Sequence, residues 1–77
     1  MIKELINELK EVLEPGNECF TIHITWNGFI EIELEWISDE ELKAIKELME
    51  SKGVKFSHIK ARDWKLFVVF EEVDSDD

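Results

Sequence analysis

The stretch FTIHITWNGFIEIELEW, residues 20–36, decides the fold. Apolar side chains occupy the even positions of 20–24 and of 30–36, and polar side chains occupy the odd positions. Alternation with a period of two is typical of a strand with one buried face. The Asn27-Gly28 pair between the two runs is a hairpin signal. The stretch therefore predicts two adjacent antiparallel strands.

The length of the turn determines which residues face each other. A two-residue turn would place Ile24 beside Glu31, so that one strand's apolar set would lie with the other strand's carboxylates. A three-residue loop, closed by Gly28 in the left-handed conformation, instead pairs Ile24 with Ile30 and His23 with Glu31. We therefore predict the three-residue bulged turn.

Two amphipathic helices flank this hairpin in the sequence. Apolar residues at helical spacing predict a first helix over 2–14, which a Pro-Gly pair ends. Ser38 followed by Glu41 is a capping box and predicts that a second helix begins near residue 39. Gly53 provides the left-handed residue that ends this second helix.

Two further strands, over about 54–60 and 64–73 and joined around Ala61, Arg62 and Asp63, complete an α-β-β-α-β-β order. The last strand is apolar on both faces, so we place it inside the sheet, in the strand order 1-2-4-3. We predict an α+β two-layer sandwich, with a four-stranded antiparallel or mixed sheet and both helices on one face. This is a permuted ferredoxin-like arrangement. We expect one domain over 1–73 and a frayed acidic tail over 74–77.

The composition limits the possible partners and locations. Nineteen acidic and nine basic residues give a net charge of −10, which repels phosphate backbones and anionic lipids. We therefore expect neither nucleic acid nor membranes as partners. The single cysteine allows no internal disulfide, and no apolar stretch has the length of a membrane span. We expect a soluble, cytoplasmic protein.

The residue types that enzymes use are not arranged for catalysis. Cys19 and His23 lie about 13 Å apart along one strand, at roughly 3.4 Å per residue, and cannot bind one metal. The three glycines are isolated, so no phosphate-binding loop is present. Neighbouring glutamates are explained by a solvated strand face. We expect no catalytic site, no cofactor and no metal.

Carboxylates form the first candidate site. Alternate glutamates of the second strand stand about 6.8 Å apart, close to the spacing of alternate phosphates on one DNA strand. We expect a small non-enzymatic protein-binding module or inhibitor, of which a nucleic-acid mimic is one form, that docks on a basic protein surface. The candidate residues are Glu31, Glu33, Glu35, Glu4, Glu8 and Glu11.

An uncovered apolar sheet face is the second candidate. If the helices cover one face of the sheet, four apolar residues point away from them: Phe29, Ile59, Phe67 and Val69. Such a face favours a symmetric dimer. The alternative function is therefore a self-associating structural domain or a designed scaffold without a ligand. A local bulge near Ser57 would instead bury these side chains.

A basic hairpin is the third candidate. Residues 52–65 have a net charge of +4 inside a chain whose total is −10. Basic and aromatic side chains together suit a nucleic-acid-binding module, the second alternative function. Lysines also protect edge strands from pairing. The residues of this patch are Lys55, Lys60, Arg62, Lys65 and Trp64.

Overall fold

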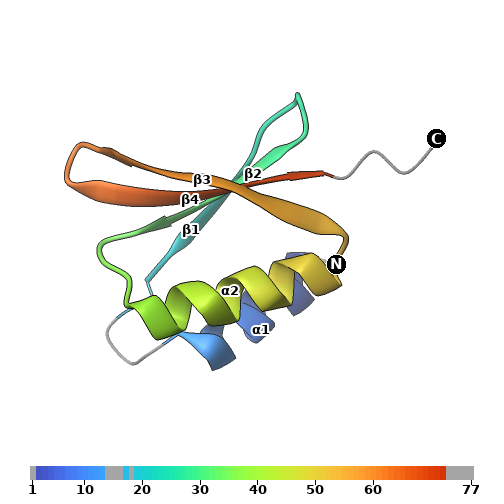
Figure 1. Ribbon diagram of the computed structural model, residues 1–77, viewed down its shortest axis with the longest axis horizontal. Helices are drawn as coiled ribbons and strands as arrows, with labels where there is room; N and C mark the ends of the chain where they lie inside the picture. Colours follow the sequence, from blue (N-terminus) through green and yellow to red (C-terminus); the bar gives the residue numbers. More distant parts are fainter. Residues whose placement is uncertain (1, 14–16, 18, 73–77) are drawn as a thin grey trace.

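A computed structural model describes residues 2–13, 17 and 19–72. The elements follow in the predicted order (Figure 1). They are α1 (Ile2–Val12), β1 (Thr21–Ile24), β2 (Phe29–Leu34), α2 (Asp39–Ser51), β3 (Val54–Arg62) and β4 (Lys65–Glu72). Helix α1 ends before the predicted residue 14, which lies outside the described residues, as does the predicted tail over 74–77.

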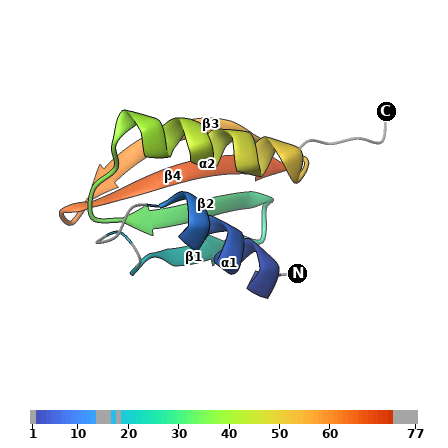
Figure 2. The ribbon, with the colours of Figure 1, turned by 90° about the horizontal axis from the view of Figure 1, so that it is seen from below.

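The four strands form one sheet in the order β1-β2-β4-β3, and every neighbouring pair is antiparallel. This confirms the predicted central position of β4. Both helices lie on the same face of the sheet (Figure 1). Helix α1 lies against β1 and β2, and α2 against β4 and β3 (Figure 2). The α+β sandwich is thus confirmed, while its likeness to a permuted ferredoxin-like fold stays a prediction.

The bulged turn between β1 and β2 is confirmed. Ile24 pairs with Ile30, and His23 with Glu31. The backbone N–H of Thr25 donates to the carbonyl of Phe29 at 2.8 Å, and Gly28 has a φ of +93°. The Thr25 hydroxyl also accepts a hydrogen bond from the Phe29 N–H at 2.9 Å. This side-chain bond joins the two ends of the loop a second time.

The core lies between the helices and one sheet face. Apolar positions of both helices meet the even-numbered side chains of β2 and β4, as the alternation requires. Burial of this apolar area is the main favourable term in folding. The buried residues are Leu9, Leu13, Ile32, Leu34, Ile45, Met49, Val54, Val68 and Phe70.

The start of α2 is fixed by buried polar groups. The Ser38 hydroxyl accepts from the Glu41 N–H at 3.1 Å, and the Glu41 carboxylate accepts from the Ser38 N–H at 3.0 Å, so the capping box is confirmed. Buried Asn17 donates to the Trp36 carbonyl at 2.7 Å and to the Glu41 carboxylate at 3.4 Å. Asn17, which belongs to the segment between α1 and β1, is thereby bonded to the start of α2.

The turn between β3 and β4 differs from the prediction. We expected a loop around residues 61–63, but β3 continues to Arg62, which pairs with Lys65. The turn consists of Asp63 and Trp64 alone, with φ values of +54° and +66°. Two consecutive left-handed residues form the type I′ turn, whose twist matches that of the strands.

A bulge in β3 corrects a second prediction. Phe56 pairs with Phe70 and His58 with Val69, so one extra residue lies between them on β3. Beyond this bulge Ile59 pairs with Val68, a core residue, and lies on the helix side of the sheet. The prediction that Ile59 belongs to the open face is therefore wrong.

Replacing Gly28 with alanine should destabilise the fold. A Cβ at this position would meet only the Glu72 carboxylate, at 3.8 Å, so the cost comes from the backbone conformation. We expect a loss of about 1–2 kcal/mol in the free energy of unfolding, measured by urea denaturation. Gly28→Asn should lose less, because asparagine tolerates the left-handed region. Equal stability of the alanine variant and the wild type would contradict the bulged turn.

Candidate functional site: the open face of the sheet

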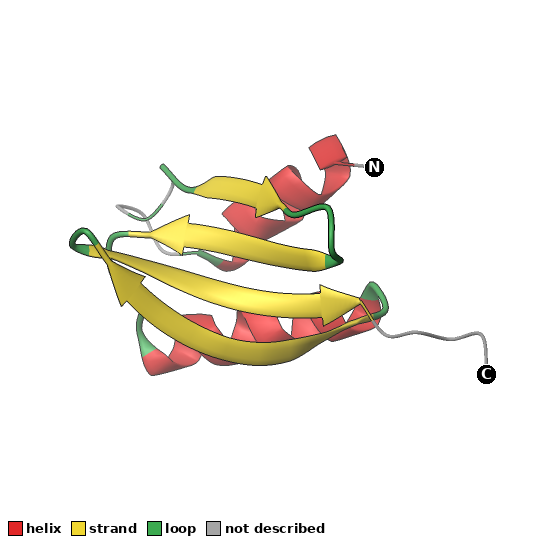
Figure 3. Ribbon diagram, turned by 90° about the horizontal axis from the view of Figure 1, so that it is seen from above, coloured by secondary structure: helices red, strands yellow, loops and turns green. Residues whose placement is uncertain are grey.

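The sheet face opposite the helices is uncovered (Figures 1 and 3). Side chains from all four strands reach this face, and an open groove of about 500 Å³ runs across part of it. The groove brings together residues from both hairpins. Its lining consists of His23, Thr25, Glu31, Glu33, Arg62, Asp63, Lys65 and Phe67.

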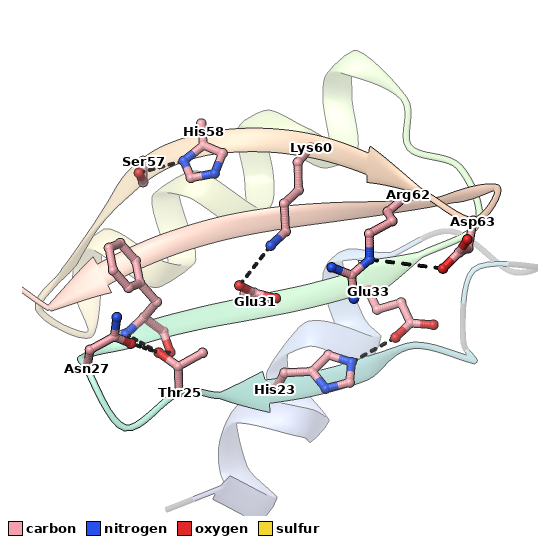
Figure 4. A network of polar contacts seen from close by, with 11 residues as sticks. His23, Thr25, Asn27, Glu31, Glu33, Ser57, His58, Lys60, Arg62 and Asp63 are labelled. Carbon is pink, nitrogen blue, oxygen red and sulfur yellow. Dashed lines mark hydrogen bonds and ion pairs between the residues drawn. The ribbon is translucent and has the colours of Figure 1, made fainter.

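Two of the predicted acids, Glu31 and Glu33 (the acidic row), lie on this surface together with part of the predicted basic patch and form ion pairs with it; Figure 4 shows the pair of Glu31 with Lys60. The Lys60 ammonium lies 3.2 Å from the Glu31 carboxylate, and the Lys65 ammonium 3.4 Å from that of Glu33. The His23 Nε2 lies 2.7 Å from the other oxygen of Glu33. Four of the charges that we assigned to two different partners, those of Glu31, Glu33, Lys60 and Lys65, are thus paired within the chain.

Strand order and register explain this network. Glu33 of β2 and Lys60 of β3 both pair with Phe67 of β4, so their side chains flank the same aromatic ring. The Lys60 ammonium lies 5.6 Å from the centroid of that ring, and the His23 ring lies 6.0 Å from it. Charged side chains from β2 and β3, the two neighbours of β4, therefore flank the apolar side chain of Phe67 on the open face.

Three of the four residues of the predicted apolar face, Phe29, Phe67 and Val69, lie on the open face as predicted, but their side chains are little exposed. Val69 is only 1% exposed, and Phe29 and Phe67 are half-buried. Ile59 lies on the opposite side of the sheet, as described above. Among the described residues, the apolar side chains of the open face are buried or half-buried beside charged ones, and the dimer through this face stays a prediction.

The remaining predicted acids lie elsewhere. Glu35 is exposed at the end of β2. Glu4, Glu8 and Glu11 belong to α1, on the other side of the sheet from the acidic row, and Glu8 lies 2.7 Å from the Lys52 ammonium. The six predicted acids therefore do not form one surface.

Sequence reasoning overlooked a row of exposed acids on α2. These four residues form no ion pair within the described part of the chain, and all four are exposed. Separations of seven and three residues, from Glu40 to Glu47 and from Glu47 to Glu50, place them on the outer side of the helix. The same spacing was readable from the sequence once the buried side of α2 was known. The residues are Asp39, Glu40, Glu47 and Glu50.

Three members of the basic patch, Lys55, Arg62 and Trp64, are less constrained than Lys60 and Lys65, which form ion pairs with glutamates. The Arg62 guanidinium lies 4.0 Å from the Asp63 carboxylate, and both side chains are mostly exposed. Lys55 is exposed and forms no ion pair within the described residues. Trp64 is 98% exposed at the tip of the β3–β4 hairpin.

The electrostatics of the groove favour a charged Glu33. The hydrogen bond from His23 is the largest influence, and together with Lys65 it holds the pKa of this carboxyl below its ordinary value of 4.5, although desolvation opposes the shift. Within the described residues, no three His, Cys, Asp or Glu side chains are grouped to hold a metal. None of the described helices is long and apolar enough to cross a membrane.

No family model matches this chain, and neither a curated protein nor a solved structure matches it. The comparisons therefore add no relative whose site could be mapped onto these residues.

The ion pairs of Glu33 should make stability depend on pH in a specific direction. A carboxyl with a lowered pKa in the folded state contributes stability above its unfolded pKa, and this contribution is lost as the pH falls through the folded value. Urea denaturation at neutral pH and below 4.5 should therefore show a smaller acid-induced loss of stability in Glu33→Gln than in the wild type.

The matched control is Glu47→Gln, which removes an exposed carboxylate of α2 that forms no ion pair within the described residues. It should retain the acid-induced loss of the wild type. If Glu33→Gln also retains the full loss, the network on the open face does not stabilise the fold.

Proposed function

We propose that this chain is a small non-enzymatic protein-binding module that docks on a basic partner through the tip of its β3–β4 hairpin. The observation that supports this most directly is the conformation and exposure of Trp64. The residue has a φ of +66° and is 98% exposed.

A tryptophan at this position is unfavourable for the isolated domain. The second position of a type I′ turn favours glycine, and a residue with a Cβ in the left-handed region costs roughly 1–2 kcal/mol. Because Trp64 is almost fully exposed, contacts inside the domain do not offset this cost. Backbone strain of this kind concentrates at functional sites.

Tryptophan is also the side chain best suited to anchor a protein interface. Interface hot spots are enriched in Trp, Tyr and Arg, which bury a large area on binding. At this tip Trp64 follows directly after Arg62 and Asp63, whose side chains are also mostly exposed. The tip thus presents an apolar anchor beside one cation and one anion.

The charges around the tip support a protein partner over a nucleic acid. Phosphate binding requires cations that are free to replace counterions, whereas Lys60 and Lys65 are already paired with glutamates. The net charge of −10 attracts basic surfaces over longer distances and accelerates encounter with them. The engaged Glu31 and Glu33 give no support to phosphate mimicry by the acidic row.

The test compares two exposed tryptophans at opposite ends of the sheet. Trp26 is 97% exposed in the β1–β2 turn and lacks a positive φ. Wild type, Trp64→Gly and Trp26→Ala are each immobilised and exposed to a native extract, and captured proteins are identified by mass spectrometry. We expect a basic protein that binds the wild type and Trp26→Ala but not Trp64→Gly.

Two further measurements make this result specific. Trp64→Gly should be as stable as the wild type or more stable by about 1 kcal/mol, because it removes the left-handed side chain. Calorimetric titration of the purified partner should show weaker binding at high salt. Identical capture by all three proteins would refute the proposal that Trp64 anchors the partner. Quenching of Trp64 fluorescence by a single-stranded oligonucleotide would favour the nucleic-acid-binding alternative.

A further inference from the structure

The two edge strands of the sheet differ in their protection against pairing. β3 has a bulge between Phe56 and His58, and it bears Lys55, Lys60 and Arg62. Bulges and basic side chains are two of the devices by which proteins prevent edge strands from pairing with other chains. β1 consists of Thr21, Ile22, His23 and Ile24, pairs with β2 in unbroken register, and has neither device.

The free edge of β1 presents the backbone groups of two residues. In an antiparallel ladder the residues alternate between bonding toward one neighbour and pointing to the other side. Because the Thr25 N–H bonds to Phe29, His23 and Thr21 also bond toward β2, and Ile22 and Ile24 point their N–H and C=O groups outward. No loop of the described chain bonds to these outward groups.

A large apolar side chain is exposed at the same edge. Ile24 is 63% exposed, although its neighbours on the helix side of the sheet pack against the core. β1 is short, at four residues, but an exposed β-branched residue on an edge strand without a bulge or a lysine is a typical template for an added strand.

We propose that a second copy of this chain pairs with β1 in antiparallel orientation, around a two-fold axis at His23. Ile22 then exchanges both backbone hydrogen bonds with the partner's Ile24, and Ile24 does the same with the partner's Ile22. The two sheets become one continuous sheet. This site is independent of the hairpin tip described under the proposed function.

The chemistry of β1 favours a second copy as its occupant. The strand contains no lysine, arginine or carboxylate, so two identical strands meet without opposing like charges. The outward groups are symmetric about His23, so an isologous pairing satisfies all of them. Each exposed Ile24 comes to lie beside the partner's Ile22, on the apolar side of the sheet. The histidines lie on the other face, each bonded to its own Glu33.

Salt separates this association from the proposed partner docking. Two copies with a net charge of −10 each repel one another, and salt screens this repulsion. Self-association through β1 should therefore strengthen as salt is added, whereas docking on a basic partner should weaken. The failure of either proposal can thus be recognised without reference to the other.

Disulfide trapping tests the register. In the proposed dimer His23 directly faces the partner's His23 in a pair that is not hydrogen-bonded, with Cα atoms about 4.5 Å apart. That separation lies within the range of disulfides. In a Cys19→Ser background, His23→Cys should form a covalent dimer under mild oxidation.

Thr21→Cys in the same background is the matched control, because Thr21 belongs to the same strand and is also exposed. It would lie about 13 Å along the strand from its counterpart, at roughly 3.4 Å per residue, and should not be trapped. Equal trapping of both variants would show random collision and overturn the proposed register.

Sedimentation equilibrium at low and high salt tests the association itself. Ile24→Pro removes an outward N–H and leaves the ladder between β1 and β2 intact, since proline is tolerated where the N–H faces solvent. We expect this variant to dimerise at least about tenfold more weakly than the wild type. Trp64→Gly should dimerise like the wild type. A wild type that stays monomeric at high salt, together with no trapping of His23→Cys, would overturn the proposal.

Discussion

Strand register is the constraint on which the rest of this structure depends. Side chains of a strand alternate between the two faces of the sheet. A slip of one residue in the pairing would therefore move all the apolar side chains of a strand to the open face and all its polar side chains to the core. The bulged turn at Gly28 places Ile30 and Ile32 toward the helices and Glu31 and Glu33 on the open face. The same register determines which backbone groups of β1 remain unpaired at the edge of the sheet.

The bulge in β3 decides the chemical character of the open face. Without the extra residue before His58, the alternation would continue unchanged from Phe56, and Ile59 would face away from the helices. With it, Lys60 takes the open-face position and reaches Glu31 across β4. One inserted residue therefore places Lys60, instead of Ile59, beside Phe67 on the open face.

The hairpin register, the capping box and the central place of β4 could be predicted because each follows from a local pattern with one acceptable solution. The bulge could be named only as an alternative, near Ser57, since the segment KFSHIKAR lacks strict alternation and fits either phase of the strand pattern. The turn at Trp64 was missed because tryptophan is not a left-handed residue by preference. The ion pairs across β4 required strand order and bulge together, so sequence reasoning assigned Glu31 and Lys60 to different partners.

Our two proposals rest on two local exceptions in the described chain, the left-handed Trp64 at the tip of the β3–β4 hairpin and the exposed Ile24 at the edge of β1. These two features lie at opposite edges of the sheet order. A dimer formed through β1 would keep both β3–β4 hairpins at the outer edges of the combined sheet, with their tips pointing in opposite directions. Two copies of Trp64 would then be displayed on one rigid body. A partner with repeated binding sites would bind such a dimer more tightly than a monomer, because the second contact would be intramolecular.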